Sequence, residues 1–283
     1  MKQFATLLLF SVLHFQCAFA QQKEIRLIVR GDDMGFSHAG NEALIKCYEE
    51  GIERSIEVLV PSPWFPEAVK MLEKHPRVDV GVHITLTTEW DNVKFRPLSD
   101  CPSLRDSSGY FYPMIWPNKN YPGQALLENK WNIADIEKEM RAQIELAKKK
   151  IPRISHISAH MGCYGMNEEV SKHARKLAVE YGLDIDPQDY HVKNIRYTGP
   201  SKTPAEKVTA MLKTLETLQP GETYLFVEHP CFDTPESRAI HHIGYENVAE
   251  DRQGVTDSWT DKRVLELVKK RGIKLISYAD LKK

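Results

Sequence analysis

Polar side chains that could bind a metal ion or transfer a proton lie at the ends of several apolar runs. Asp32 and Asp33 end the first run, and His83 lies at the end of another, VDVGVHI. Two adjacent carboxylates at the end of a buried strand need a cation or a shared proton to offset their charge. Taken singly, the aspartates could instead cap the helix that follows, and His83 could be a core histidine bonded to backbone.

Two further runs lead into histidines. SHISAH carries His156 and His160, and TYLFVE is followed by His229. The H-x-x-x-H spacing starts in an expected strand and runs into a loop, so either both rings converge on the aspartates or only one does. One aspartate and two histidines form an open nitrogen and oxygen site that suits zinc best, with Mg²⁺ or another divalent ion as the alternative.

Short apolar runs alternate with helix-like stretches along the chain, and this alternation predicts the elements that position the polar groups. About seven strands in this alternation predict an α/β fold, an irregular (β/α) barrel of parallel strands with its site at their carboxyl ends. No glycine-rich phosphate loop follows any strand, which argues against a dinucleotide-binding fold. The expected strands are 24–30, 55–60, 78–84, 154–158, 183–185, 223–228 and 273–277.

Residues 1–20, MKQFATLLLFSVLHFQCAFA, have the pattern of a secretory signal peptide. Lys2 precedes an apolar stretch too short to span a bilayer, and a cleavage signal of the A-x-A type ends at Ala20. Cleavage leaves residues 21–283 as one domain, exported to the periplasm or the cell exterior without membrane insertion. A lipoprotein anchored on Cys17 is the alternative.

Composition excludes some partners. The 283 residues include 38 Lys plus Arg and 39 Asp plus Glu, a net charge of −1, which gives no global attraction to nucleic acid or anionic membranes. No close C-x-x-C pair exists, so we expect the cysteines beyond residue 20 to be buried free thiols. The segment 85–130 breaks the βα alternation, and we expect it to be a long loop on the substrate side.

These residues, in this order, resemble the YdjC-like family of carbohydrate deacetylases, which includes ChbG-type enzymes. The resemblance covers most of the chain beyond residue 20 and is carried by GDDMGFSHAGNEA, VGVHITLT, SLRDSSGYFY, SHISAH, VEHP and RGIKLIS. It implies an irregular (β/α) barrel related to polysaccharide deacetylases. It also implies removal of acetyl groups from N-acetylated mono- or oligosaccharides with the help of one divalent metal ion.

The resemblance assigns a role to each residue at the strand ends. Asp32 becomes the general base and His229 the general acid. The metal ligands that it implies are Asp33, His83 and His156.

Three further residues are expected on the substrate side. They are His160, Trp90 in the long segment, and Arg252 in a polar stretch before the last helix. Aromatic faces such as that of Trp90 stack on the apolar faces of sugar rings. A long loop can, however, also bury its aromatic residues as a small core of its own.

The chain departs from the family pattern near the expected site. Ser158 stands where an aspartate is expected, Cys231 stands where glycine often follows His-Pro, and Arg30-Gly31 replaces the usual Asn-Ala. Two alternatives therefore stay open beside sugar deacetylation. One is a metal-dependent hydrolase for a different acyl group or a non-sugar amine, and the other is a secreted carbohydrate-binding protein that has lost catalysis. The sequence is also compatible with a homo-oligomer.

Overall fold

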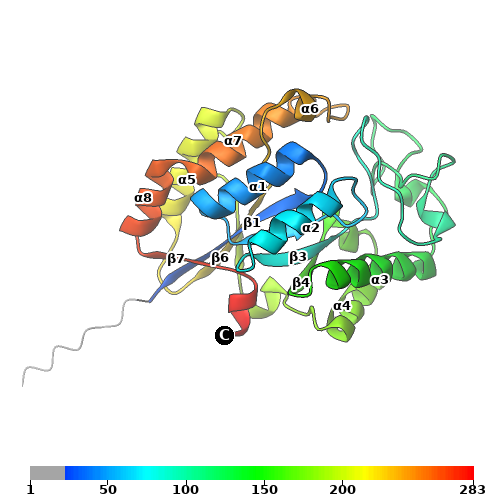
Figure 1. The fold of residues 1–283 in the computed structure, drawn as a ribbon, viewed down its shortest axis with the longest axis horizontal. Helices are drawn as coiled ribbons and strands as arrows, with labels where there is room; N and C mark the ends of the chain where they lie inside the picture. Colours follow the sequence, from blue (N-terminus) through cyan, green and yellow to red (C-terminus); the bar gives the residue numbers. More distant parts are fainter. Residues whose placement is uncertain (1–22) are drawn as a thin grey trace, which may run out of the picture.

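The computed structural model describes residues 23–283, so the expected signal peptide lies outside the described residues. Seven parallel strands form one curled sheet with helices packed around it (Figure 1), which confirms the expected α/β class. The strands are β1 (Ile25–Met34), β2 (Ser55–Val58), β3 (Asp79–Ile84), β4 (His156–Ala159), β5 (Lys193–Ile195), β6 (Thr223–Glu228) and β7 (Ile273–Ile276). The helices are α1 (His38–Glu50), α2 (Phe65–Lys74), α3 (Ile133–Lys150), α4 (Glu168–Tyr181), α5 (Pro204–Thr217), α6 (Pro235–Arg238), α7 (Val248–Thr260) and α8 (Lys262–Lys270).

The sheet curls like a barrel but does not close. Its strands follow the order β4-β3-β2-β1-β6-β5, and β7 pairs with the first half of β1. The outer edges of β4 and β5 pair with no further strand of the described chain, which leaves an open seam between them. The strands remain parallel throughout, so their carboxyl ends still meet at one end of the molecule, as in a closed barrel.

Two elements differ from the sequence expectation. The weak strand expected at 183–185 is only a single antiparallel bridge, between Asp184 and His156, and the fifth strand lies at Lys193–Ile195 instead. Helix α7 was not expected at all. It packs against both α1 and α5, so buried residues surround it and its sequence lacks the single apolar stripe that marks an amphipathic helix.

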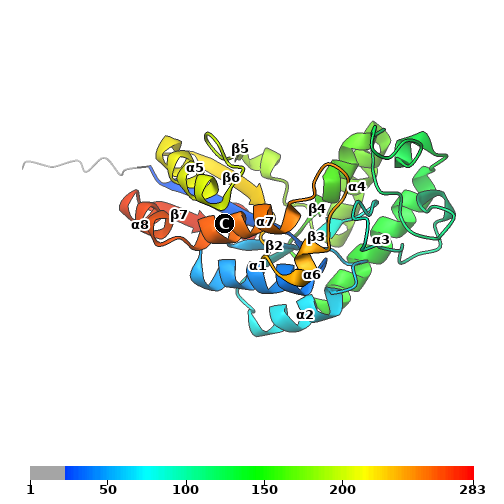
Figure 2. The same ribbon diagram turned by 90° about the horizontal axis from the view of Figure 1, so that it is seen from above.

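The long segment 85–130 contains no strand or α-helix, only two short 3₁₀ turns. It lies beyond the carboxyl end of β3, next to α3 (Figures 1 and 2). Three of its aromatic residues, Trp90, Phe95 and Phe111, are at most 1% exposed and belong to the same core as β2 and β3. The segment is therefore held by its own buried aromatic side chains, which was the alternative to a substrate-binding role for them.

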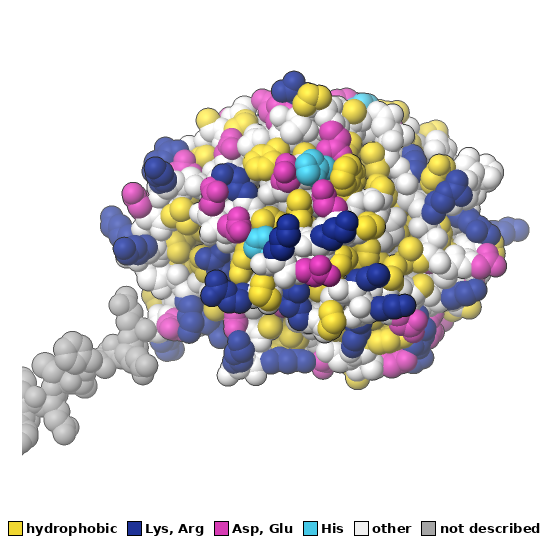
Figure 3. Space-filling model, viewed as in Figure 1, with side chains coloured by type: hydrophobic (Ala, Val, Ile, Leu, Met, Phe, Trp, Pro, Cys, Tyr) yellow, Lys and Arg dark blue, Asp and Glu magenta, His cyan; other side chains and the backbone are white. Residues whose placement is uncertain are grey.

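The surface agrees with the balanced composition. On the face shown in Figure 3, acidic and basic side chains are interspersed. No helix within residues 23–283 is long and apolar enough to cross a membrane. The four cysteines in this range are buried and unpaired, as expected.

Gly51, which ends α1, has backbone on two sides. A methyl group added there would lie 2.6 Å from the carbonyl oxygen of Cys47 and 2.6 Å from that of Trp259. Because backbone atoms cannot move aside easily, we predict that Gly51→Ala lowers the free energy of unfolding by about 1–3 kcal/mol. Gly165→Ala is the control, since nothing lies within 4 Å of its added methyl group. Urea unfolding measures both variants, and equal stability would contradict the expected clash.

Candidate active site

A β-bulge at the end of β1 turns two consecutive aspartates toward the same place. Side chains normally alternate between the two faces of a strand, so Asp32 and Asp33 would point apart. Between Gly31 and Met34, however, the register of β1 against β2 shifts, and Asp33 adopts a φ of 72°. An extra residue in one strand of a pair re-aims the side chains around it, and aspartate tolerates the left-handed region better than most residues.

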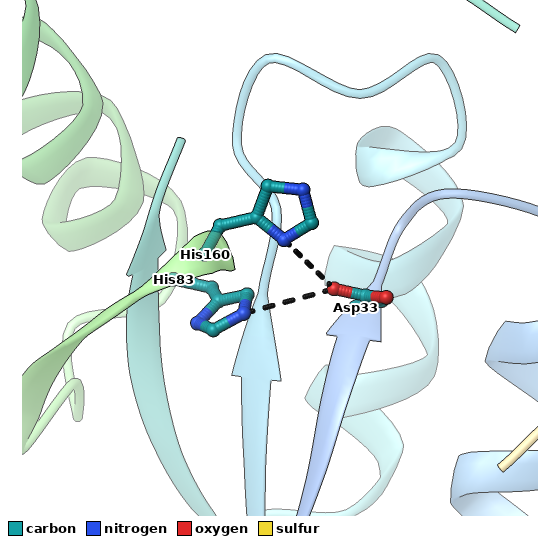
Figure 4. Close-up of side chains that lie close together, drawn as sticks. All are labelled: Asp33, His83 and His160. Carbon is teal, nitrogen blue, oxygen red and sulfur yellow. Dashed lines mark ion pairs between the residues drawn. The ribbon is translucent and has the colours of Figure 1, made fainter. Parts of the chain in front are cut away.

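Asp33 lies next to two histidines from other strands (Figure 4). Its Oδ1 atom is 3.2 Å from Nδ1 of His160, which follows β4, and 3.7 Å from Nε2 of His83 on β3. All three residues are buried, and each presents one donor atom within 4.8 Å of the others. The strand-end argument therefore placed Asp33 and His83 correctly, and it left open which histidine of SHISAH would join them.

The donor atoms of this group fit a divalent metal ion. Zinc bonds to imidazole nitrogen and carboxylate oxygen are about 2.0–2.2 Å long, so tetrahedral ligand atoms lie about 3.4 Å apart. The separations of 3.2 and 3.7 Å around Asp33 Oδ1 lie on either side of that value. The same oxygen is buried and accepts no well-formed hydrogen bond from the described residues, so it remains available to a cation.

The outward-facing nitrogen of each histidine is bonded to another side chain. His83 Nδ1 is 2.7 Å from Ser158 Oγ, and His160 Nε2 is 3.0 Å from Glu89 Oε2. Such contacts fix which nitrogen a metal-binding imidazole turns inward. Glu89 follows β3 and is buried.

The two histidines differ in charge because their surroundings differ. Burial lowers the pKa of His83 to about 4. Burial acts in the same direction on His160, but the carboxylates of Glu89 and Asp33 outweigh it and raise the pKa of His160 to about 10. The two carboxylates beside His160 thus favour positive charge at this position, whether a proton or a metal ion supplies it.

Arg252 holds the other oxygen of Asp33. Its Nη2 atom donates to Asp33 Oδ2 at 3.0 Å, and its guanidinium lies over the rings of Phe36 and Trp90, at 4.8 and 5.0 Å from their centres. Burial acts to raise the pKa of Asp33, but His229 and Arg252 outweigh it and lower that pKa well below its usual range. Arg252 and Trp90 were expected to contact substrate. The structure buries both, with Arg252 bonded to Asp33 and Trp90 packed against Arg252.

Asp32 is held by a basic residue on its own strand. Arg30 Nη2 donates to Asp32 Oδ2 at 2.8 Å, and Arg30 Nη1 donates to the hydroxyl of Tyr278 at 2.8 Å. The same Asp32 oxygen lies 3.6 Å from His83 Nε2. Asp32 therefore borders the group of possible ligands, as its expected role as a base requires.

His229 reaches the group from the end of β6. Its Nε2 atom lies 3.9 Å from Asp33 Oδ2, and 36% of its side chain is exposed. Burial acts to lower the pKa of His229, but the charge of Asp33 and the contact with Glu228 raise it. His229 is thus a partly exposed imidazole at the edge of a buried acidic group, and that group favours its protonated form.

His156, the expected third ligand, does not lie in the group. It begins β4, whereas His160 comes after the strand has ended, and a strand advances about 3.3 Å per residue. Its Nε2 atom is 2.5 Å from Glu57 Oε1, its Nδ1 atom is 2.7 Å from Ser155 Oγ, and its ring stacks on Tyr278. Both nitrogens already lie within hydrogen-bonding distance of protein side chains, so the structure brings His160, and not His156, together with Asp33 and His83.

Two acids and one base near the group were missed from the sequence. Glu57 lies in the middle of the short, fully buried strand β2, and Glu89 follows the strand that carries His83. A charged residue inside an otherwise apolar strand was the available signal for Glu57, and Glu89 could have been found by extending the strand-end argument by five residues. Arg30 was noted only as a departure from the family pattern.

A cavity of about 700 Å³ opens at the seam between β4 and β5. Its inner wall includes Arg30, Ser158 and Tyr278, whereas Asp33, His83 and His160 do not line it. The cavity therefore reaches the residues behind the group of possible ligands and not the ligands themselves.

Comparisons with known proteins agree with the fold. A carbohydrate deacetylase of Enterococcus faecalis is 27% identical, over 90% of this chain and 98% of that protein. A carbohydrate deacetylase of Thermus thermophilus is 31% identical, over 76% of this chain and 80% of that protein. A solved structure from Enterococcus faecalis, described as that of a candidate cellobiose-phosphate cleavage protein, shares the fold, with a TM-score of 0.71 and 24% identity over 91% of this chain and 99% of that one.

The sequence model of the family described as YdjC-like protein matches residues 26–270, from β1 to the end of α8. The resemblance found in the strand-end motifs is thereby confirmed, and this chain belongs to the YdjC-like protein family.

Proposed function

We propose that this protein is a metal-dependent deacetylase that removes acetyl groups from N-acetylated sugars. The convergence of Asp33, His83 and His160, with Asp32 and His229 beside them, is the observation that carries the proposal. Hydrolysis of an amide needs an electrophilic centre, a base and an acid, and this group offers residues for all three. Relatives named carbohydrate deacetylases support a sugar as the substrate.

Zinc is the metal ion that we propose, with Mg²⁺ or another divalent ion as the alternative. Two imidazoles and one carboxylate are the donor set of many catalytic zinc sites, in which the fourth position stays open. When bound, the ion would polarise the amide carbonyl and lower the pKa of the attacking water toward neutrality. Asp33, His83 and His160 would hold it, with Arg252 fixing the second oxygen of Asp33.

Asp32 is the proposed base. Arg30 bonds to its carboxylate and keeps it beside His83, so that it does not turn away into solvent. In this position the carboxylate can accept a proton from a water molecule that attacks the amide carbon. General base help of this kind contributes about 10²–10⁴-fold to a rate.

His229 is the proposed acid. The raised pKa favours the protonated form of its imidazole, and its partial exposure allows contact with a substrate that arrives from solvent. It can donate that proton to the nitrogen of the leaving amine. His229 approaches Asp33 from β6 and Asp32 belongs to β1, so the proposed acid and base come from different strands.

An exposed aromatic side chain near Asp33, His83 and His160 could stack on a sugar ring. Trp116 in the segment 85–130 is 45% exposed, unlike the buried Trp90. A methyl group built on Gly162 would lie 3.6 Å from its ring, and Gly162 is two residues beyond His160. Trp116 is therefore the aromatic residue of the long segment that we propose for stacking on a sugar ring.

We predict that the purified protein releases acetate from N-acetylated chito-oligosaccharides, and that a metal chelator stops the release. Asp32→Asn should lower turnover by at least about 10²-fold, because the amide cannot act as a base. Asp100→Asn, at an exposed position, is the matched control and should leave turnover unchanged. If Asp32→Asn kept full activity, the base would be misassigned. If no acetylated sugar lost acetate while metal was bound, a binding protein would be the better description.

The choice between the two histidines of SHISAH can be tested by metal binding alone. We predict that His160→Gln loses bound zinc, because it removes an inward-facing nitrogen. His156→Gln should retain zinc, since His156 contacts Glu57 and Ser155 instead. Zinc content per chain after dialysis measures both variants. Loss of zinc from His156→Gln with retention in His160→Gln would reverse the assignment.

We also propose that the chain is exported and cleaved after Ala20. Expressed in full length in a bacterium, the mature protein should begin at Gln21, as measured by mass spectrometry of the intact chain. Ala20→Leu should block cleavage, because the signal requires a small residue there. A mature chain that still begins at Met1, or one that carries lipid on Cys17, would contradict this proposal.

A further inference from the structure

Three neighbouring strands bring a buried acid to the back of His83. Glu57 on β2 pairs with Gly81 on β3, and Gly81 pairs with His156 on β4, so the three lie in one row across the sheet. A methyl group on Gly81 would lie 2.3 Å from Glu57 Oε2 and 2.6 Å from His156 Nε2. The glycine thus leaves the space in which the Glu57 side chain crosses β3 to reach β4.

Two residues further along β3 and β4, Ser158 joins this acid to His83. His83 and Ser158 are paired across β3 and β4, and Ser158 is on the same face of β4 as His156. Ser158 Oγ lies 2.5 Å from Glu57 Oε2 and 2.7 Å from His83 Nδ1. Glu57, Ser158 and His83 are all at least nine-tenths buried.

The directions of these hydrogen bonds follow from the protons available. Burial acts to raise the pKa of Glu57, but the charge and hydrogen bond of His156, together with Arg30, lower it to about 2, so the carboxylate only accepts. The single hydroxyl proton of Ser158 is then donated to Glu57. The serine oxygen is left as an acceptor for His83, whose Nδ1 must carry the proton.

We propose that Ser158, oriented by Glu57, is a positioning residue that holds His83 in the Nδ1–H tautomer and so turns the lone pair of Nε2 toward Asp33. The tautomer is a property of the protein by itself. Only the statement that Nε2 then binds a metal ion rests on the proposed function. A serine–carboxylate pair would thus act on His83 as Glu89 acts directly on His160.

Nitrogen-15 NMR of the metal-free full chain, labelled at histidine, reads the tautomer directly. In the wild-type protein we expect His83 to show a protonated Nδ1 and an unprotonated Nε2, with the signals assigned by their loss in His83→Gln. Ser158→Ala should remove the acceptor and give a mixture of tautomers or the Nε2–H form. An Nε2–H tautomer in the wild type, or no change in Ser158→Ala, would overturn the proposal.

Two further variants separate this role from a general effect on packing. Ser158→Thr keeps the hydroxyl and suits a strand, so it should keep the Nδ1–H tautomer. Ser171→Ala removes a hydroxyl that bonds to the backbone of Tyr164 and should leave His83 unchanged. If Ser158→Ala does not fold, the test rests on Ser158→Thr. A change of the His83 tautomer in that variant would count against the proposal, and an unchanged Nδ1–H tautomer would support it.

Zinc affinity, measured by chelator competition, gives the second readout. Ser158→Ala should bind zinc about 10–100-fold more weakly than wild type, and Ser158→Thr should bind it nearly as well. Wild-type protein that binds no divalent ion would contradict the proposed function and leave the tautomer result standing. Zinc binding of equal strength in wild type and Ser158→Ala would contradict the positioning role and leave the proposed function standing.

Discussion

The buried carboxylate of Asp33 is the constraint on which the arrangement at the end of β1 depends. A carboxylate in the protein interior is stable only when positive charge and hydrogen bonds replace the water it has lost. Arg252 supplies one such charge from α7, and the imidazoles of His160 and His229 supply more from the ends of β4 and β6. Contacts with a single acid thus bring elements far apart in sequence together at one end of the sheet, where the bulge in β1 places Asp33.

The sequence allowed the class of fold and most of the site to be predicted, for one physical reason. Parallel strands place their carboxyl ends together, so polar residues that follow apolar runs must meet. This argument brought Asp32, Asp33, His83 and His229 to one place without knowledge of any contact. It needs only the order of strands along the chain, and apolar periodicity reports that order well.

The remaining features depend on distances that periodicity does not report. Whether His156 or His160 reaches Asp33 depends on where β4 ends, and a shift of four residues along a strand exchanges the two. Trp90 was assigned to substrate because of its position after β3, but exposure depends on how the long segment folds back on the core. Glu57 acts from the middle of a strand, and its reach depends on the absence of a side chain at Gly81 on the neighbouring strand. No pattern within one strand can show such a relation between two.

Arg30 and Ser158, the departures from the family pattern nearest the group, are linked through Glu57. Burying a carboxylate without a partner costs roughly several kcal/mol of free energy, so an ionised Glu57 requires positive charge nearby. Arg30 provides it, His156 hydrogen-bonds to the carboxylate, and Arg30 also pairs with Asp32. Once Glu57 is ionised, it accepts the hydroxyl hydrogen bond of Ser158, which leaves the serine oxygen as the acceptor for a proton on Nδ1 of His83. Arg30 on β1 therefore stabilises the ionised form of Glu57 on β2, and Glu57 orients the hydroxyl of Ser158 on β4. Substitution of Arg30, Glu57 or Ser158 would therefore change the charge or the hydrogen bonds of the other two.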